Sequence, residues 1–336
     1  MKNKCIITCF LCLMLLPAGM GGGCSKKAEV TADNSALAET DQSVQQETVT
    51  KAAVTEAAKP SEQPSKETSA SEDTSPWKLI SDSSVDTAMF YAGFLNESVG
   101  VTVGYSGAIS YTEDGGKSWS QSDNVSACRY GLDLYDESLI VSSGNLGVNL
   151  ISSDQGKSWN RLTDFPLKNS NYYNKFLSIT DNKNIYVGSK VSLAVSGDEG
   201  KSWEELKLPE NCKEIMGMYF MTPEIGYLLG KDGTLVKTKD SGKTWTAQTI
   251  DLAGEIIANT TMPSVAINFQ DEDHGMIVYA THKYQLRGIK TEDGGNTWQS
   301  MEMPKGTCLT PYISRDGKYL TLSSLLKKIC LYELEE

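Results

Sequence analysis

Short apolar runs alternate with polar turns along residues 77–336 of this 336-residue chain. Such runs occupy residues 101–103, 139–141, 185–187, 227–229 and 276–279. Each is followed by a turn and a second run, and no long stretch has the 3.6-residue period of an amphipathic helix. The pattern predicts an all-β domain with about four short strands in each repeating unit.

One eight-residue motif recurs at 112–119, 152–159, 196–203, 238–245 and 291–298. All copies read Ser/Thr-x-Asp-x-Gly-Lys/Asn-Ser/Thr-Trp, and we call the motif the octad. Its Asp and Trp residues are Asp114, Trp119, Asp154, Trp159, Asp198, Trp203, Asp240, Trp245, Asp293 and Trp298. Repetition at a nearly fixed period predicts an array, a solenoid or a propeller.

The chemistry of the octad favours a structural turn. An Asp carboxylate accepts backbone N–H bonds from residues just after it, and the Gly two positions on tolerates positive φ. The Trp then supplies apolar surface for packing. The alternative is a catalytic or calcium-binding Asp, but a calcium loop needs several oxygen ligands at fixed offsets. We therefore predict no metal and no cofactor.

The repeat extends beyond the octad and sets the number of blades. A Gly precedes the first four octad Asp residues by ten positions, at Gly104, Gly144, Gly188 and Gly230. Trp77 has no octad before it, whereas residues 309–334 supply about three strands and no Trp. We expect the first strand to complete the last blade. The prediction is a six-bladed β-propeller of four-stranded antiparallel blades, spanning 77–336.

The octads resemble the Asp-box (BNR) repeat of sialidases, sortilin-type receptors and photosystem II assembly factors. The longer unit 94–119 is most similar to the stability/assembly-factor family, and the resemblance covers 77–336. It implies a propeller in which the Asp box is structural, and a role in assembly. Fold-level resemblance does not define activity.

The N-terminal quarter of the chain has the pattern of a secreted, lipid-anchored protein. Lys2 and Lys4 precede an apolar run at 6–16, which is too short to span a bilayer and is typical of a signal peptide. The sequence Gly21-Gly22-Gly23-Cys24-Ser25 resembles a bacterial lipobox, although Gly21 replaces the usual Leu. We predict a lipoprotein signal peptide at 1–23, lipidation of Cys24, and a disordered tether at 24–76 rich in Ser, Thr, Glu and Ala. The alternative is an ordinary secretory peptide.

An extracellular glycoside hydrolase of sialidase type is the alternative function. The resemblance to sialidases would imply three arginines that clamp a carboxylate, together with a Tyr–Glu pair. The predicted propeller contains only Arg129, Arg161, Arg287 and Arg315, and no Arg-Ile-Pro segment precedes the first octad. We therefore favour a non-catalytic protein.

Other chemistries find little support. The chain has 2 His residues and no His/Cys cluster with metal-ligand spacing. Its net charge of −12 opposes nucleic acid binding. Cys308 and Cys330 fall in the last unit, where they form a disulfide or remain buried thiols.

Departures from the repeat indicate where a ligand binds. Tyr279 takes the place of Gly230 but lies fourteen residues before Asp293, so 280–287 contains about four extra residues. The loops 163–174 and 251–264 are also long. Aromatic and Arg side chains on loops suit binding, so the candidate ligand-binding residues are Tyr172, Tyr173, His282, Tyr284 and Arg287; the alternative is tolerated loop variation.

Together these features predict a monomeric propeller lipoprotein on the outer side of a bacterial cell membrane. It would bind a protein or glycan partner as a scaffold, assembly factor or receptor.

Overall fold

The computed structural model describes residues 75–122, 127–162, 173–181, 183–252, 256, 263–305, 310–324 and 327–335. All of these belong to one compact unit, Ser69–Glu336. The predicted signal peptide, Cys24 and almost all of the tether lie outside the described residues. Within the described part of the chain, no helix is long and apolar enough to cross a bilayer.

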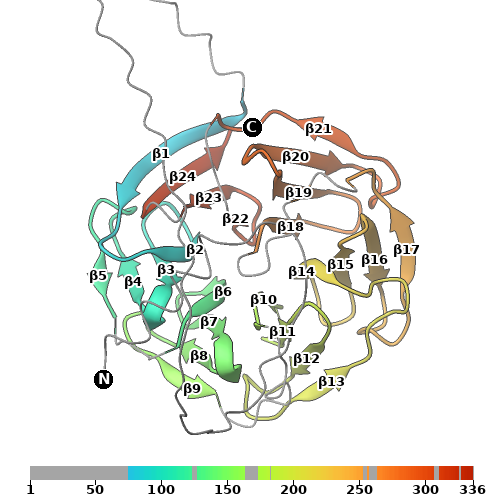
Figure 1. Cartoon of the computed structure of the whole chain (residues 1–336), viewed down its shortest axis with the longest axis horizontal. Coiled ribbons are helices and arrows are strands. Elements are labelled where there is room, and N and C mark those ends of the chain that lie inside the picture. Colours follow the sequence, from blue (N-terminus) through green and yellow to red (C-terminus); the bar gives the residue numbers. More distant parts are fainter. Residues whose placement is uncertain are drawn as a thin grey trace, which may run out of the picture. The chain divides into compact units, whose positions relative to one another are not determined.

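The domain is a six-bladed β-propeller with four antiparallel strands in each blade (Figure 1). Blades one and two contain β2 (Met89–Phe94), β3 (Gly100–Gly104), β4 (Ile109–Thr112), β5 (Ser120–Gln121), β6 (Arg129–Asp136), β7 (Leu139–Gly144), β8 (Asn149–Ser152) and β9 (Asn160–Leu162). Blades three and four contain β10 (Phe176–Ile179), β11 (Ile185–Gly188), β12 (Leu193–Ser196), β13 (Glu204–Leu206), β14 (Ile215–Phe220), β15 (Gly226–Gly230), β16 (Thr234–Thr238) and β17 (Thr246–Thr249). Blades five and six contain β18 (Val265–Phe269), β19 (Gly275–Ala280), β20 (Leu286–Thr291), β21 (Gln299–Met301), β22 (Thr310–Ile313), β23 (Tyr319–Ser323), β24 (Lys328–Leu334) and β1 (Trp77–Ser84). Short 3-10 turns, η1 (Tyr105–Gly107) and η2 (Asn145–Gly147), follow β3 and β7.

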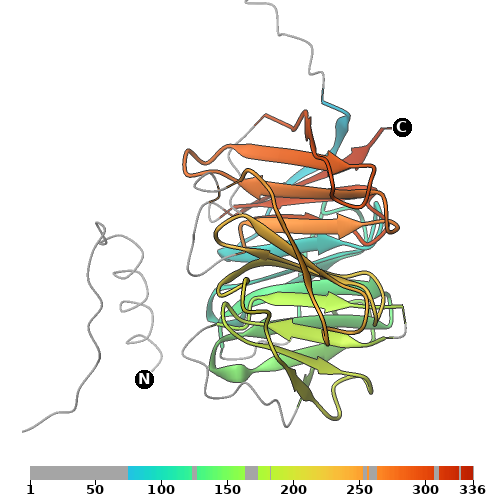
Figure 2. The same cartoon turned by 90° about the vertical axis from the view of Figure 1, so that its right-hand side faces the viewer.

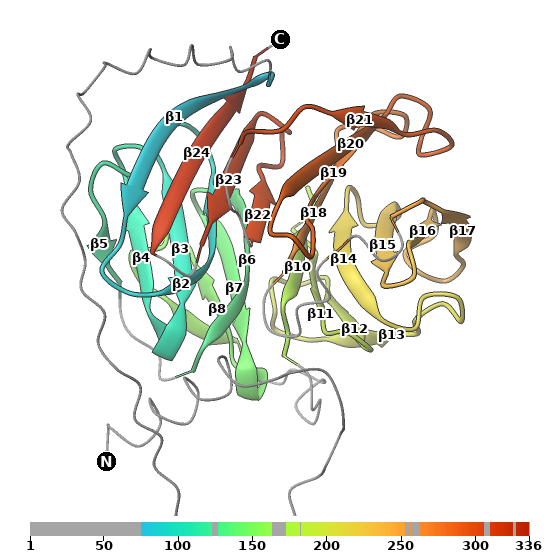
Figure 3. The same ribbon diagram turned by 45° about the horizontal axis from the view of Figure 1, so that its top comes forward.

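The ring closes as the orphan Trp77 predicts. The last sheet has the order β1-β24-β23-β22, so the first strand of the domain is the outer strand of the last blade. Figure 3 shows β1 beside β24, and their pairing runs from Trp77 opposite Leu334 to Ser84 opposite Lys328. This pairing joins the two ends of the domain without an open seam between blades.

The strands run between two faces of the ring, which is seen edge-on in Figure 2. One face carries the octads, and we call it the octad face. Four octads donate a backbone N–H group to the turn between the first two strands of their own blade, as from Gly115 to Ser98 O (2.9 Å) and from Ser241 to Glu224 O (3.0 Å). The opposite face carries the connections from second to third strands and from blade to blade, and we call it the loop face.

The five octads share one hydrogen-bond pattern. In the first, Asp114 accepts bonds from the Thr112 hydroxyl (2.8 Å), the Ser118 N–H (2.9 Å) and the Ser118 hydroxyl (2.6 Å). These bonds, chiefly those from Ser118, lower the pKa of Asp114 to about 2. Each carboxylate is thus occupied within its own turn, which supports the turn interpretation. Among the described residues, no group of three or more His, Cys, Asp or Glu side chains could hold a metal ion.

The core between strands is built from Phe, Gly and Trp at repeated positions. Phe94, Phe220 and Phe269 end the first strands of three blades, and each ring lies edge-on to the octad Trp of its blade. The glycine that starts the second strand makes room for this ring. A Cβ at Gly226 would lie 2.4 Å from the Phe220 ring, so no larger residue fits there.

Candidate functional site

The first strands of the six blades lie around the centre of the ring (Figure 1), and we call the space between their side chains the central channel. Its cavity has a volume of about 40 Å³ and is lined by residues that include Tyr91, Asp133, Tyr219, Tyr312 and Arg315. That volume holds only a few water molecules, whereas pockets for small organic ligands measure roughly 300–1,000 Å³. The channel between the described residues is therefore packed, and it leaves no room for a sugar ring.

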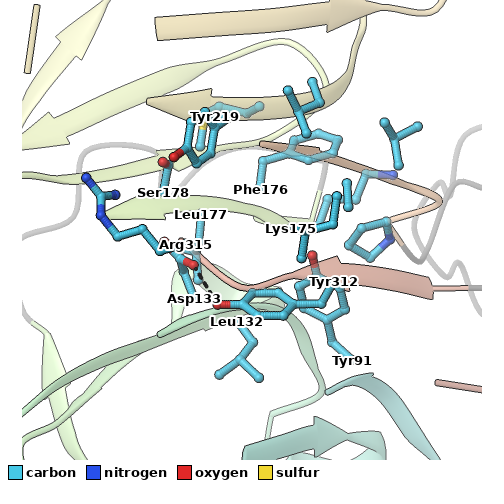
Figure 4. Close-up of a pocket in the computed structure, with 16 residues that line it drawn as sticks. Tyr91, Leu132, Asp133, Lys175, Phe176, Leu177, Ser178, Tyr219, Tyr312 and Arg315 are labelled. Atoms are coloured by element: carbon cyan, nitrogen blue, oxygen red, sulfur yellow. Dashed lines mark hydrogen bonds between the residues drawn. The ribbon is translucent and has the colours of Figure 1, made fainter. Parts of the chain in front are cut away.

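Asp133, on β6, is the central acceptor of the channel. Its carboxylate accepts bonds from the Ile179 N–H (2.7 Å), the Leu134 N–H (3.1 Å) and the Tyr312 hydroxyl (3.3 Å), and Figure 4 shows the last of these. Removal from bulk water raises the pKa of Asp133 to about 6, against the opposing effects of these bonds and of Arg315. Asp133 therefore links blade two to blades three and six.

Arg315 crosses the octad-face end of the channel. It lies just after β22 in blade six, and its guanidinium donates to Ile179 O (2.5 Å) in blade three and to Met221 O (2.8 Å) just after β14 in blade four. Its Cζ also lies 5.2 Å from the centre of the Tyr135 ring in blade two. The rigid fork of an arginine suits such a set of partners, so Arg315 ties four blades together.

Lys175 lies at the opposite end of the channel, just before β10. Its side chain is almost completely buried, and burial lowers its pKa to about 7, with a smaller contribution from Lys190. The ammonium lies 5.1 Å from the centre of the Phe176 ring. The channel thus holds one acidic and two basic side chains, and the contacts of Asp133 and Arg315 join different blades.

The four arginines of the domain do not converge. Arg129 is fully buried in blade two, where it donates to Ala127 O and Val148 O. Arg161 is exposed on β9, the outermost strand of that blade, and Arg287 is exposed on β20. Only Arg315 lies at the channel. A sialidase clamp needs three arginines at one point, and these four arginines do not provide it.

The loop face carries a continuous row of four aromatic side chains, Tyr105, Phe90, Tyr130 and Tyr173, which we call the aromatic row. Phe90 stacks on Tyr130 with ring centres 5.3 Å apart and planes 10° apart. Tyr105 meets Phe90 edge-on at 6.0 Å, and Tyr173 lies 4.5 Å from Tyr130. The inner two rings are buried, while Tyr105 is half-buried and Tyr173 is 40% exposed.

Bulges in the first strands place the inner two rings of this row. Met89 pairs with Gly104 and Tyr91 with Val103, so Phe90 has no partner in the strand ladder. Tyr130 is left out of the ladder in the same way between Arg129 and Gly131. A bulge re-aims the side chain that it carries, and here two successive bulges bring equivalent residues of neighbouring blades into contact.

The residues predicted from loop length fall into two separate groups. Tyr173 joins the aromatic row near the start of blade three, whereas His282, Tyr284 and Arg287 lie exposed on blade five. Tyr172 lies outside the described residues. The loop of blade five is shorter than the predicted range 280–287, because Ala280 pairs with Leu286 and Tyr279 pairs with Arg287 in the strand ladder. Part of the insertion lengthens the hairpin, and Arg287 belongs to β20.

The blade-five hairpin has a tight tip. Tyr284 adopts a positive φ of 57° and is 53% exposed, and Thr281 of the same turn forms a bridge with Ile256 of the preceding long loop. The two unusual loops of blade five therefore meet. Whether they bind a ligand stays a prediction, as does the disulfide, because Cys330 lies on β24 but Cys308 lies outside the described residues.

Loop length did not identify the residues of the channel or the other members of the aromatic row. Asp133, Lys175, Tyr312 and Arg315 carry no local motif, and only closure of the ring places them along one channel. The sequence does contain a signal for the aromatic row. Phe90 precedes Gly104 by fourteen residues, and Tyr130 precedes Gly144 by the same number. An aromatic residue repeated at that offset could have identified it.

The raised pKa of Asp133 predicts a specific pH dependence. An unfolded Asp titrates near 3.9, so the folded protein holds this proton more tightly, and the stability that this contributes is lost as pH rises from about 4 to about 6. Asp133→Asn removes this titration. We expect the free energy of unfolding of the variant, relative to the unaltered protein, to rise by about 2 kcal/mol between pH 4 and pH 7, because one pKa unit corresponds to about 1.4 kcal/mol and the unfolded Asp is already partly ionised at pH 4. Urea unfolding at both pH values measures this, and parallel pH profiles for the two proteins would contradict it.

Comparisons with known proteins agree on the fold. The Sortilin-Vps10 family (sortilin, neurotensin receptor 3) matches residues 191–318. Among solved structures, YCF48 bound to a D1 peptide is 13% identical with a TM-score of 0.52, over 78% of this chain and 98% of that one. The WD40 propeller domain of Doa1 is 13% identical with a TM-score of 0.53, over 77% and 98%. Virginiamycin B lyase from Staphylococcus aureus is 13% identical with a TM-score of 0.50, over 72% and 79%. A search of the curated proteins gives no match. Such distant similarity establishes the propeller fold alone.

Proposed function

We propose that this chain is a non-catalytic binding protein, held outside a bacterial membrane by lipid on Cys24 and the tether 24–76. Its loop face would hold a protein partner. The observation that carries the proposal is the aromatic row, because rigid aromatic side chains with one buried edge supply contact area at little entropic cost. YCF48 bound to a D1 peptide, a propeller similar to this one, supports a protein partner.

The hydrolase alternative gains no support from the geometry of the described residues. The channel holds about 40 Å³, and three of the four arginines lie away from it. The acid Asp133 is already engaged by two backbone N–H groups and a tyrosine. We therefore assign these groups to holding the ring together.

The experiment is cross-linking of the chain in membranes of a cell that makes it, followed by identification of the captured protein. Tyr105→Ala combined with Tyr173→Ala should lower capture at least tenfold, because the exposed rings of the row are lost. Leu79→Ala, an exposed apolar side chain on β1, is the matched control and should leave capture unchanged. Cys24→Ala should move the chain out of the membrane fraction.

A second pair of variants separates the two groups of candidates. If Tyr284→Ala with Arg287→Ala abolishes capture while the double Tyr variant does not, the binding face lies on blade five and the aromatic row is structural. Release of sugar from a sialoside by the purified protein would overturn the non-catalytic assignment.

A further inference from the structure

A groove opens on the octad face between blades four and five. It has a volume of about 490 Å³, and its lining includes Tyr227, Lys237, Lys239, Gln248, Glu272 and Asn296. It is far from the aromatic row and independent of it. Its size matches the pockets of roughly 300–1,000 Å³ that hold small ligands.

The groove exists where one octad departs from the repeat. The sixth octad position is Lys117, Lys157, Lys201 and Lys243 in four copies but Asn296 in the fifth. Between blades one and two, Lys157 reaches the Glu113 carboxylate (2.7 Å) and lies 5.9 Å from the centre of the Tyr111 ring. The Asn296 amide instead turns back to Asp293 O (2.6 Å), so it does not span the corresponding gap.

A buried hydroxyl beside the groove has no hydrogen-bond partner. Tyr186 in blade three and Tyr227 in blade four occupy equivalent positions, and each stacks on the Phe of the next blade, Phe220 or Phe269. The Tyr186 hydroxyl donates to Pro223 O (3.0 Å), whereas the Tyr227 hydroxyl is buried and unpartnered. An unsatisfied buried hydroxyl costs stability, so its retention calls for an explanation.

Lys237 explains why the Tyr227 hydroxyl lacks a hydrogen-bond acceptor. It faces Tyr227 across the strand pair, at the position of Val195 in blade three. Its ammonium lies 3.5 Å from Glu272 O, the carbonyl equivalent to that of Pro223. Lys237 thus replaces an apolar residue, takes the acceptor that Tyr227 would use, and places a charge in the groove.

The charges of the groove suit a neutral ligand that can both donate and accept hydrogen bonds. Lys237 and Lys239 share the Glu272 carboxylate, at 3.8 and 2.5 Å. Asp273 and Asp293 also line the groove, so an anion would meet carboxylates and a cation would meet ammonium groups. Gln248 and Asn296 add uncharged polar side chains, and the buried Tyr227 hydroxyl lies beside the groove with no partner among the described residues. We propose that this groove binds a neutral saccharide of one or two rings.

The test is a panel of neutral and acidic mono- and disaccharides against the purified full chain, followed by calorimetry of those that bind. We expect a neutral sugar to bind and the acidic ones not to bind. Asn296→Lys, which restores the residue of the other four octads, should weaken binding at least tenfold and keep the melting temperature. Binding of none of the neutral sugars, preference for acidic ones, or unchanged affinity in Asn296→Lys would overturn the proposal.

A matched pair of tyrosine variants keeps the test independent of folding defects. Tyr227→Phe should keep or raise the melting temperature and weaken sugar binding several-fold, whereas Tyr186→Phe should lower the melting temperature and leave sugar binding unchanged. Equal behaviour of the two variants would contradict a role for Tyr227 in the groove. The double variant Tyr105→Ala with Tyr173→Ala should still bind the sugar, so this site and the protein-binding face can fail separately.

Discussion

A chain that starts at Val85 is expected to lose its cooperative unfolding transition, whereas one that starts at Ser75 keeps it. The deleted β1 is the outer strand of blade six, and its ladder to β24 covers Trp77–Ser84. Trp77 is buried in a cluster with residues of blades five and six, among them Met276, Val278, Leu320 and Leu322. Loss of a buried Trp side chain alone costs roughly 3–5 kcal/mol, and a domain has only about 5–15 kcal/mol in all.

The measurement is guanidinium unfolding followed by near-ultraviolet circular dichroism, which reports fixed aromatic packing. The truncated chain should also aggregate, because β24 becomes an unpaired edge strand. Addition of a peptide of residues 75–84 is the control, since it should restore the signal if the loss comes from the missing strand. A truncated chain with the same transition midpoint would show that blade six closes without β1.

Arg315→Met is expected to lower the free energy of unfolding by about 3 kcal/mol, because it removes one partner from a set of desolvated polar contacts. The carbonyls of Ile179 and Met221 lose their donor, and Asp133 loses a nearby positive charge. Arg287→Met is the matched control. Arg287 is exposed, and within the described part of the chain its guanidinium donates to the Gln285 side chain alone (3.3 Å), so its loss should change stability by less than about 0.5 kcal/mol.

Urea unfolding at pH 7 measures both variants. Arg315→Lys adds a finer comparison, because a single ammonium cannot reproduce the two directed bonds of the guanidinium. We expect it to lie between the unaltered protein and Arg315→Met. If Arg315→Met and Arg287→Met were equally stable, the contacts across the channel would contribute nothing, and Arg315 would be available for binding.

The octad shows how a motif can define architecture without defining a site. Its repetition predicts the strands, and its carboxylates are engaged inside their own turns. The one informative departure is Asn296, which looks conservative in sequence. Its consequence is evident only in the structure, where Lys237, Lys239 and Glu272 line the groove that the shorter Asn296 side chain leaves open.

The sequence by itself determined the repeat, the blade count and the closing strand. These depend on local chemistry, because Asp, Gly and Trp at fixed offsets form the turns, leave space for aromatic rings and supply apolar packing inside each unit. Trp77 has no octad before it, which indicates that its strand belongs to the last blade. Only the tertiary structure decided what meets at the channel, along the aromatic row and in the groove. Asp133, Ile179, Tyr312 and Arg315 come from three different blades, and ring closure sets their contacts. The local sequence does not determine which residues of different blades come into contact. Loop length could therefore point to Tyr173 but not to Phe90 and Tyr130 beside it.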